Sequence, residues 1–237
     1  MTPKDLTTFE ILYNSTRLIA SCIYTYIYTL FSKFNSYMLL GTDGKYMNNL
    51  IKQYHIKEGC IKELSNKTEW SIMSYNIHGG FDIYNNYTIN KIINVIDKED
   101  IDILCIQELY SRDQFNYIKS SLGYTYGYCD LSRGNSNGIG ICSRFPIKEN
   151  SFKNLQSYGV FYTNSYSVTK LDISSKDTNQ GIFFNKLYII QVHLSHDITG
   201  YKQTLELDEV SNYIKEQFND TDKIIVIGDF NTPQYSY

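Results

Sequence analysis

Residues 223–231 read Lys-Ile-Ile-Val-Ile-Gly-Asp-Phe-Asn, an apolar run that stops abruptly at a polar segment. The short, β-branched run Lys223–Ile227 predicts a buried β-strand. The segment that follows carries a carboxylate, Asp229, and an amide, Asn231, two positions apart. In extended backbone, side chains two positions apart point to the same side. This stretch therefore predicts a strand of a sheet whose end carries polar chemistry.

Polar segments end four other apolar stretches in the same way. Two of them, around Asn76 and Glu108, are 32 residues apart, which is the length of one strand–helix–strand unit. In α/β sheets the ends of such strands meet at one edge, where binding sites usually lie. The four segments are Tyr75–Gly80 (YNIHGG), Ile106–Glu108 (IQE), Ser136–Pro146 (SNGIGICSRFP) and Val192–Leu194 (VHL).

Strands and helices alternate along the chain from residue 69 onward. The isoleucines of residues 88–99 recur at helical spacing, whereas residues 101–106 form a short apolar run typical of a buried strand. Such alternation predicts an α/β domain. Further helices are expected at 112–122 and 203–218, further strands at 70–77, 138–143 and 187–194, and antiparallel strands within 150–185.

The strand-end residues have the chemistry of a metal-assisted hydrolytic site. Glu108 is an anionic oxygen ligand and, with Asn76, suits Mg²⁺ or Mn²⁺, which prefer oxygen donors. His193 is a hydrogen-bond donor, and Asp229 with Asn231 can orient a water and a phosphate oxygen. Metal charge and donors that stabilise developing negative charge are what phosphodiester hydrolysis requires.

Each of these residues also has a simpler interpretation. Glu108 fits a solvated loop end, His193 fits a hydrogen-bonded core histidine, and the asparagines Asn76 and Asn231 fit ordinary turns. Gly228-Asp229 alone is a common turn pair. Their order along the chain and their placement at strand ends, taken together, favour the site.

The set YNIHGG, ILCIQE, GIGICSRFPI, QVHLS and IVIGDFN resembles the endonuclease/exonuclease/phosphatase (DNase I-like) superfamily. The resemblance runs from about Trp70 to Asn231, with the five motifs in the order of the family. It implies a four-layer α/β/β/α sandwich with the site at one edge of two packed sheets. It also implies a hydrolase of phosphoester bonds that acts on nucleic acid or on a phospholipid or phosphoinositide head group.

The resemblance implies a role for each motif residue. Asn76 and Glu108 would hold the divalent metal, Mg²⁺ or Mn²⁺. His193 would contact the scissile phosphate, Asp229 would orient or activate the attacking water, and Asn231 would bind a phosphate oxygen and help to position Asp229. Arg144 falls in a segment of the family that is expected to be structural.

The sequence departs from the family after IVIGDFN. Family members continue through further strands to a Ser-Asp-His motif that is essential for hydrolysis, whereas this sequence stops at Tyr237. We therefore expect a domain at 67–237 that lacks its final strands. Three explanations stay open. The chain is a fragment of a longer gene product, or a complementing chain supplies the missing strands, or the chain is a catalytically inactive relative that only binds.

Residues 1–66 lie outside the resemblance and form an N-terminal extension. Leu18–Ser32 is an uncharged aromatic run of fifteen residues, shorter than the ~20 that span a bilayer as a helix. We expect an aromatic amphipathic helix packed on the domain, while membrane association through 18–40 and disorder stay open as alternatives. Membrane association would favour a lipid head-group substrate.

Composition excludes a few classes of protein. With 42% hydrophobic and 20% charged residues the chain is not wholly disordered. A net charge of −3 provides no global basic field, so nucleic-acid binding would have to be local. The five cysteines form no C-x-x-C pair, which disfavours a disulfide scaffold or zinc site and favours a reducing intracellular compartment.

Overall fold

The computed structural model describes residues 70–84, 86–132, 138–156, 164–173, 186–197 and 199–232. The predicted aromatic helix at 18–32, the membrane association of 18–40 and the extension at 1–66 lie outside these residues. Within the described part, no helix has both the length and the apolar character needed to cross a membrane.

The first sheet has the strand order β1-β2-β4-β3. β1 (Ile72–Asn76) and β2 (Ile103–Leu109) are parallel, as expected for strands joined through a helix. β4 (Gly138–Ser143) is antiparallel both to β2 and to β3 (Tyr126–Asp130). The carboxyl ends of β1 and β2 therefore lie at the same edge of this sheet.

The second sheet has the order β5-β6-β7-β8. β5 (Ile147–Asn154), β6 (Ser165–Asp172) and β7 (Lys186–His193) form an antiparallel meander. β8 (Ile224–Asp229) returns parallel to β7 after α5 (Tyr201–Gln217). The carboxyl ends of β7 and β8 thus lie side by side.

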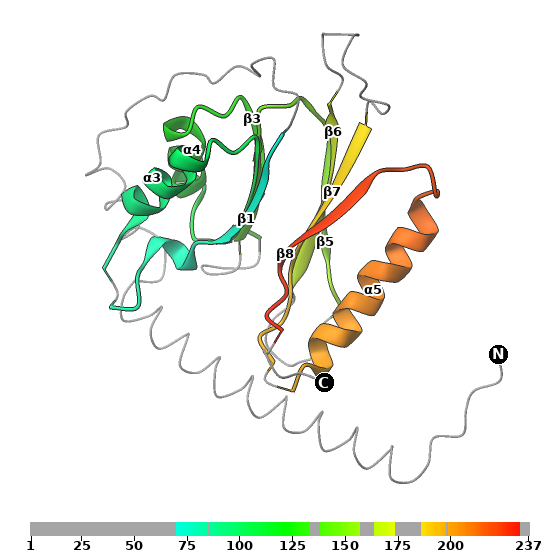
Figure 1. Ribbon diagram of the computed structural model, residues 1–237. Coiled ribbons are helices and arrows are strands. Elements are labelled where there is room, and N and C mark those ends of the chain that lie inside the picture. Colours follow the sequence, from blue (N-terminus) through cyan, green and yellow to red (C-terminus); the bar gives the residue numbers. More distant parts are fainter. Residues whose placement is uncertain are drawn as a thin grey trace, which may run out of the picture.

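The two sheets face each other, and helices cover their outer sides (Figure 1). α3 (Ile89–Glu99) and α4 (Arg112–Ser121) cover the first sheet, and α5 covers the second. The one-turn helix η1 (His78–Gly80) follows β1. The expected four-layer α/β/β/α sandwich is confirmed.

Strand β2 shows why residues 103–106 are apolar at every position. Its Leu104 and Ile106 belong to the cluster beneath α3 and α4, whereas Ile103 and Cys105 belong to the cluster between the sheets. A strand buried on both faces reads as a continuous apolar run. A third cluster, built around Ile190, Val192 and Val210, fills the space between the second sheet and α5.

The prediction that Lys223–Ile227 is a buried strand is wrong in its burial. β8 forms as expected, but its residues are only partly buried, and Val226 is 39% exposed. The reason is position: β8 is the terminal strand of its sheet among the described residues and pairs with β7 on one side only.

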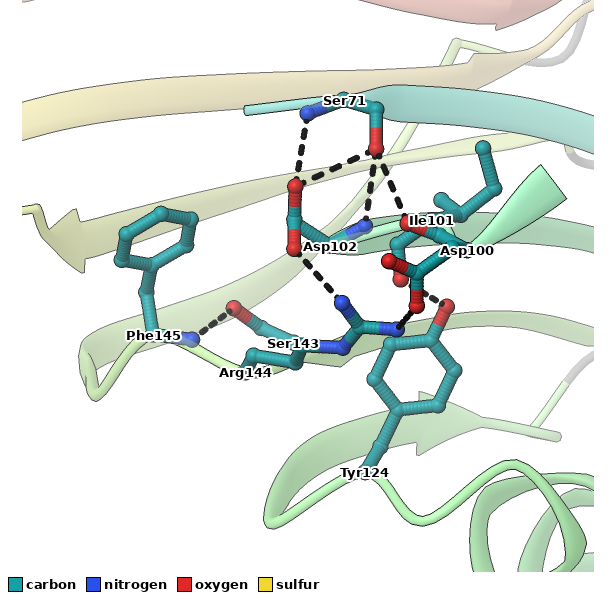
Figure 2. Close-up of polar contacts among 8 residues, drawn as sticks. All are labelled: Ser71, Asp100, Ile101, Asp102, Tyr124, Ser143, Arg144 and Phe145. Atoms are coloured by element: carbon teal, nitrogen blue, oxygen red, sulfur yellow. Dashed lines mark hydrogen bonds and ion pairs between the residues drawn. The ribbon is translucent and has the colours of Figure 1, made fainter. Parts of the chain in front are cut away.

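Arg144 forms a buried polar cluster at the end of the first sheet that carries the start of β2, where residues 71 and 102 meet (Figure 2). Its guanidinium contacts Asp102 at 2.8 Å and Asp100 at 2.6 Å. The Asp102 carboxylate also accepts hydrogen bonds from the Ser71 amide and hydroxyl. The expectation that Arg144 is structural is confirmed.

Candidate functional site

Polar residues from both sheets meet where the strands end. In β1 and β2, Asn76 pairs with Gln107, which places Glu108 beside it. In β7 and β8, His193 pairs with Asp229. The structure therefore brings Asn76, Glu108, His193 and Asp229 together, as the strand-end pattern predicts.

The side-chain amide of Asn76 joins two carboxylates. Its Nδ2 donates to Glu108 Oε1 at 2.8 Å and to Asp229 Oδ2 at 2.7 Å. Its Oδ1 accepts a hydrogen bond from the backbone N–H of His78 at 3.0 Å. The amide nitrogen thus stands between two anionic groups, which is a position that a cation can also satisfy.

Glu108 reaches this position because the strand is irregular there. The pairing of β2 with β4 shifts between Gln107 and Leu109, so Glu108 is an extra residue, and its φ is +60°. A bulge of this kind re-aims a side chain that regular alternation would direct elsewhere. Positive φ recurs at His78 (46°) and Asn231 (46°), so strained backbone gathers around the site.

His193 is a largely buried imidazole beside an acid. Only 6% of the residue is exposed, and its Nε2 lies 3.8 Å from Glu108 Oε1. Burial lowers the pKa of His193, and the nearby charges of Glu108 and Asp229 oppose that shift. The neutral ring is therefore favoured, with one nitrogen donating and the other accepting.

Asp229 is held from both sides. Its Oδ1 accepts the backbone N–H of Asn231 at 2.9 Å, and its Oδ2 accepts from Asn76. The prediction that Asp229 and Asn231 share one face of extended backbone is wrong, because Asn231 has a left-handed backbone just after β8. Its side-chain Nδ2 instead donates to the Leu194 carbonyl at 2.9 Å.

Three potential ligands lie close enough to share one ion. Atoms of Glu108, His193 and Asp229 all lie within 4.8 Å of one another. Among the described residues, no lysine or arginine forms an ion pair with either carboxylate. Two close carboxylates with no lysine or arginine partner among these residues fit a divalent cation that prefers oxygen donors. His193, which the resemblance assigns to phosphate contact, stands within this group.

Gln203 contributes to the site and is missed by sequence reasoning. It is 2% exposed, and its Nε2 donates to the carbonyls of Asn231 at 2.8 Å and Asp197 at 2.9 Å. It thereby ties the first turn of α5 to the loop after β8. Its only sequence signal is a polar residue within an amphipathic helix, which is too common to single it out.

Two packed sheets with outer helices and an acid-lined edge at their strand ends define the DNase I-like class of folds. Residues 73–236 match the model of the Endonuclease/Exonuclease/phosphatase family. Because the match covers more than half of the sequence, this chain belongs to that family. No curated protein matches it significantly.

Solved structures share the fold at low sequence identity. TDP2 from C. elegans is 18% identical with a TM-score of 0.54, over 71% of this chain and 49% of that one. A mannosyl-6-phosphatase from Bacteroides thetaiotaomicron is 19% identical with a TM-score of 0.56, over 70% of this chain and 67% of that one. An endonuclease/exonuclease/phosphatase from Beutenbergia cavernae is 19% identical (TM-score 0.53), over 68% and 47%. The chain thus spans about half to two thirds of their lengths.

Proposed function

We propose that this chain is a divalent-metal-dependent hydrolase of phosphoester bonds. The observation that carries the proposal is the meeting of Glu108, His193 and Asp229 within 4.8 Å, at the edge where strand ends of both sheets converge. Family membership supports the same reaction class. The ion we propose is Mg²⁺ or Mn²⁺, because the oxygen donors of Glu108 and Asn76 suit such cations.

Glu108 and Asn76 would hold the ion. Glu108 supplies an anionic oxygen, and Asn76 would supply its side-chain carbonyl oxygen, because its Nδ2, which donates to both carboxylates, cannot bind a cation. When bound, a divalent ion supplies positive charge that stabilises the negative charge developing on phosphate oxygens. The strained backbone at Glu108 supports this role, because strain of this kind gathers at functional sites.

Asp229 would accept the proton of the attacking water. Each of its oxygens already accepts one hydrogen bond, from Asn231 and from Asn76, so its orientation is set before substrate arrives. A carboxylate oxygen can accept more than one hydrogen bond, so both retain capacity for a water. His193 would donate a hydrogen bond to the phosphate, and Asn231 would position Asp229 through its backbone N–H and contact a phosphate oxygen.

The substrate we propose is a phosphoester in a nucleic acid or in a phospholipid or phosphoinositide head group. The net charge of −3 gives no general attraction for polyanions, so local contacts would select the substrate. Assays on a small phosphodiester and on a small phosphomonoester separate diesterase from monoesterase activity before larger substrates are compared.

The test is hydrolysis of bis-p-nitrophenyl phosphate and p-nitrophenyl phosphate by the purified chain with Mg²⁺, with Mn²⁺ and with EDTA. Turnover should require the metal and fall about 10²- to 10⁴-fold in Asp229→Asn, as expected for loss of a general base. Asp208→Asn, an exposed change on α5 with the same loss of charge, should leave turnover unchanged. Metal-independent turnover, or turnover equal in wild type and Asp229→Asn, would overturn the proposal.

A complementing chain is a further proposal that the same assay addresses. β8 pairs with β7 on one side only among the described residues, and Val226 on it is 39% exposed. Edge strands with apolar side chains are suited to strand addition. Activity that appears only when a second chain carrying additional strands is supplied would support complementation, whereas activity of the chain alone would make it unnecessary.

A further inference from the structure

The candidate site is divided between two sheets, so its geometry depends on how the sheets are held apart. Asn76 and Glu108 come from the first sheet, and His193 and Asp229 come from the second. We propose that Gln191 is a positioning residue that sets the separation of these two halves. This inference rests on the proposed function, because it assigns Gln191 a role in the same site.

Gln191 forms a direct hydrogen bond between the sheets. It lies on β7, is fully buried, and its side-chain Nε2 donates to the backbone carbonyl of Ile106 on β2 at 2.7 Å. Ile106 precedes Glu108 by two residues, and Gln191 precedes His193 by two residues. The bond therefore lies directly behind the site on both strands that carry the Glu108–His193 contact.

The position of β7 is passed on to the rest of the site. Gln191 pairs with Ile227 on β8, and His193 pairs with Asp229. A shift of β7 relative to β2 would thus move His193 and Asp229 together, away from Glu108 and Asn76. The 2.7 Å bond from Asn76 to Asp229 and the 3.8 Å contact from His193 to Glu108 both depend on the position of β7 relative to β2.

Burying a glutamine at this position costs more free energy than burying an aliphatic residue, so packing alone does not explain it. The same face of β7 carries Leu187 and Ile189 in the apolar cluster between the sheets. Apolar contacts are non-directional, whereas a hydrogen bond fixes both a distance and a direction. The Oε1 of Gln191 is buried without a partner among the described residues, and such an atom carries a desolvation penalty. An aliphatic side chain would avoid that penalty but would not fix the position of β7 relative to β2.

The proposal predicts a loss in turnover rather than in substrate binding. Misplacement of catalytic groups by about 1 Å can reduce turnover about 10²-fold, even when the altered residue does not touch the substrate. Gln191→Met removes the hydrogen bond with little change in size. We expect kcat to fall about 10- to 100-fold with KM within about twofold of wild type.

The experiment compares Gln191→Met and Gln191→Asn with the control Ile189→Val. Asn is polar but one methylene shorter, so it also loses the bond and serves if the Met variant does not fold. Ile189 lies on the same face of β7 and is fully buried, so Ile189→Val tests the effect of a disturbed core without a lost inter-sheet bond. The measurements are kcat and KM, affinity for Mn²⁺ alone by calorimetry, and crystal structures of wild type and variants.

A lower kcat with retained KM, weaker Mn²⁺ binding and a widened Glu108–His193 separation in the Gln191 variants, but not in Ile189→Val, would support the proposal. If the Gln191 variants keep turnover and Mn²⁺ affinity within twofold of wild type, the proposal is overturned. If the wild type neither hydrolyses phosphoesters nor binds Mn²⁺, the proposed function fails, and the crystal structures alone decide. An unchanged Glu108–His193 separation in a Gln191 variant would then refute the positioning role.

Discussion

Asn76 and Asp229 are 153 residues apart in sequence, and the amide of one donates to the carboxylate of the other at 2.7 Å. This bond crosses from the first sheet to the second at the edge where both end. The same amide also donates to Glu108, so one neutral donor separates two acids. A single substitution at Asn76 therefore changes the balance of charge in this group of residues, and its effect on stability can be measured.

Asn76→Asp tests that balance. A third carboxylate beside Glu108 and Asp229 adds like-charge repulsion and removes a donor shared by both, so the variant should melt at a lower temperature than wild type in EDTA. Ligand binding to the folded state raises the melting temperature. Mg²⁺ or Mn²⁺ should therefore raise Tm more in Asn76→Asp than in wild type.

The matched control is Asn212→Asp, an exposed change of the same kind on α5. It should leave both the Tm in EDTA and the response to metal near the wild-type values. Differential scanning fluorimetry across a metal titration gives both quantities. Equal metal responses in Asn76→Asp and wild type would argue against a cation between these carboxylates.

Gly228→Ala tests the close pairing of β8 with β7. Gly228 has φ +150°, and a Cβ at this position would come 1.9 Å from the carbonyl oxygen of Val192. That oxygen belongs to backbone and cannot rotate away, so β8 must move or separate. We expect a loss of about 2–4 kcal/mol in the free energy of unfolding, measured by urea denaturation.

Val226→Ala is the control for this change on the same strand. Val226 is 39% exposed, so truncating it should cost much less than the glycine substitution. A Gly228→Ala protein as stable as Val226→Ala would show that the two strands separate easily. The site residue Asp229 follows Gly228 directly, so Gly228→Ala should also impair turnover.

The sequence predicts the elements of this fold well because their signals are local. The isoleucines Ile89, Ile92, Ile93 and Ile96 lie on the buried face of α3 as their spacing indicates. The strand ends at Asn76 and Glu108 also meet as expected. Helix and strand periodicity depends on neighbouring residues alone, so it can be recognised without knowledge of the tertiary structure.

The parts that the sequence does not predict depend on contacts between distant segments. The bulge at Glu108 arises from its pairing with β4, and the left-handed backbone at Asn231 occurs in a residue type for which it is only an occasional choice. The Gln203 bond to the Asn231 carbonyl joins a helix to a loop 28 residues later. The partial exposure of β8 follows from its place in the sheet and not from its composition.

Arg144→Met tests the buried ion pair in Figure 2. The side chains of Arg144 and Asp102 are 4% and 1% exposed, so removing Arg144 breaks a buried ion pair. Breaking a buried pair in this way typically costs 3–5 kcal/mol. Because the cluster lies away from the candidate site, the loss should appear in urea denaturation, while kcat measured well below the melting temperature should stay within about twofold of wild type.

The double variant Arg144→Met/Asp102→Leu separates lost charge from lost shape. Replacing both charges by apolar groups is often neutral or stabilising, so the double variant should recover much of the lost stability. Ser71 would lose an acceptor in this variant, because its amide and hydroxyl donate to Asp102, so full recovery is not expected. A double variant less stable than Arg144→Met would contradict this account.

The buried carboxyl of Glu206 makes the free energy of unfolding depend on pH. The residue is 2% exposed, and burial raises the pKa of its carboxyl above the ordinary 4.5, against opposing hydrogen bonds from Ser195 and Asn164 and the charge of Lys202. The folded chain then holds this proton more tightly than the unfolded chain, so the contribution of Glu206 to stability falls as pH rises from about 4.5 through the raised folded pKa. For one proton the slope cannot exceed about 1.4 kcal/mol per pH unit.

In Glu206→Gln, which cannot ionise, that decline should vanish. Urea denaturation from pH 4 to pH 8 should therefore show the variant gaining stability relative to wild type as pH rises, even if one lost Ser195 hydrogen bond lowers its stability at every pH. A difference between the two proteins that stays constant across the range would mean that this carboxyl titrates alike in the folded and unfolded chains.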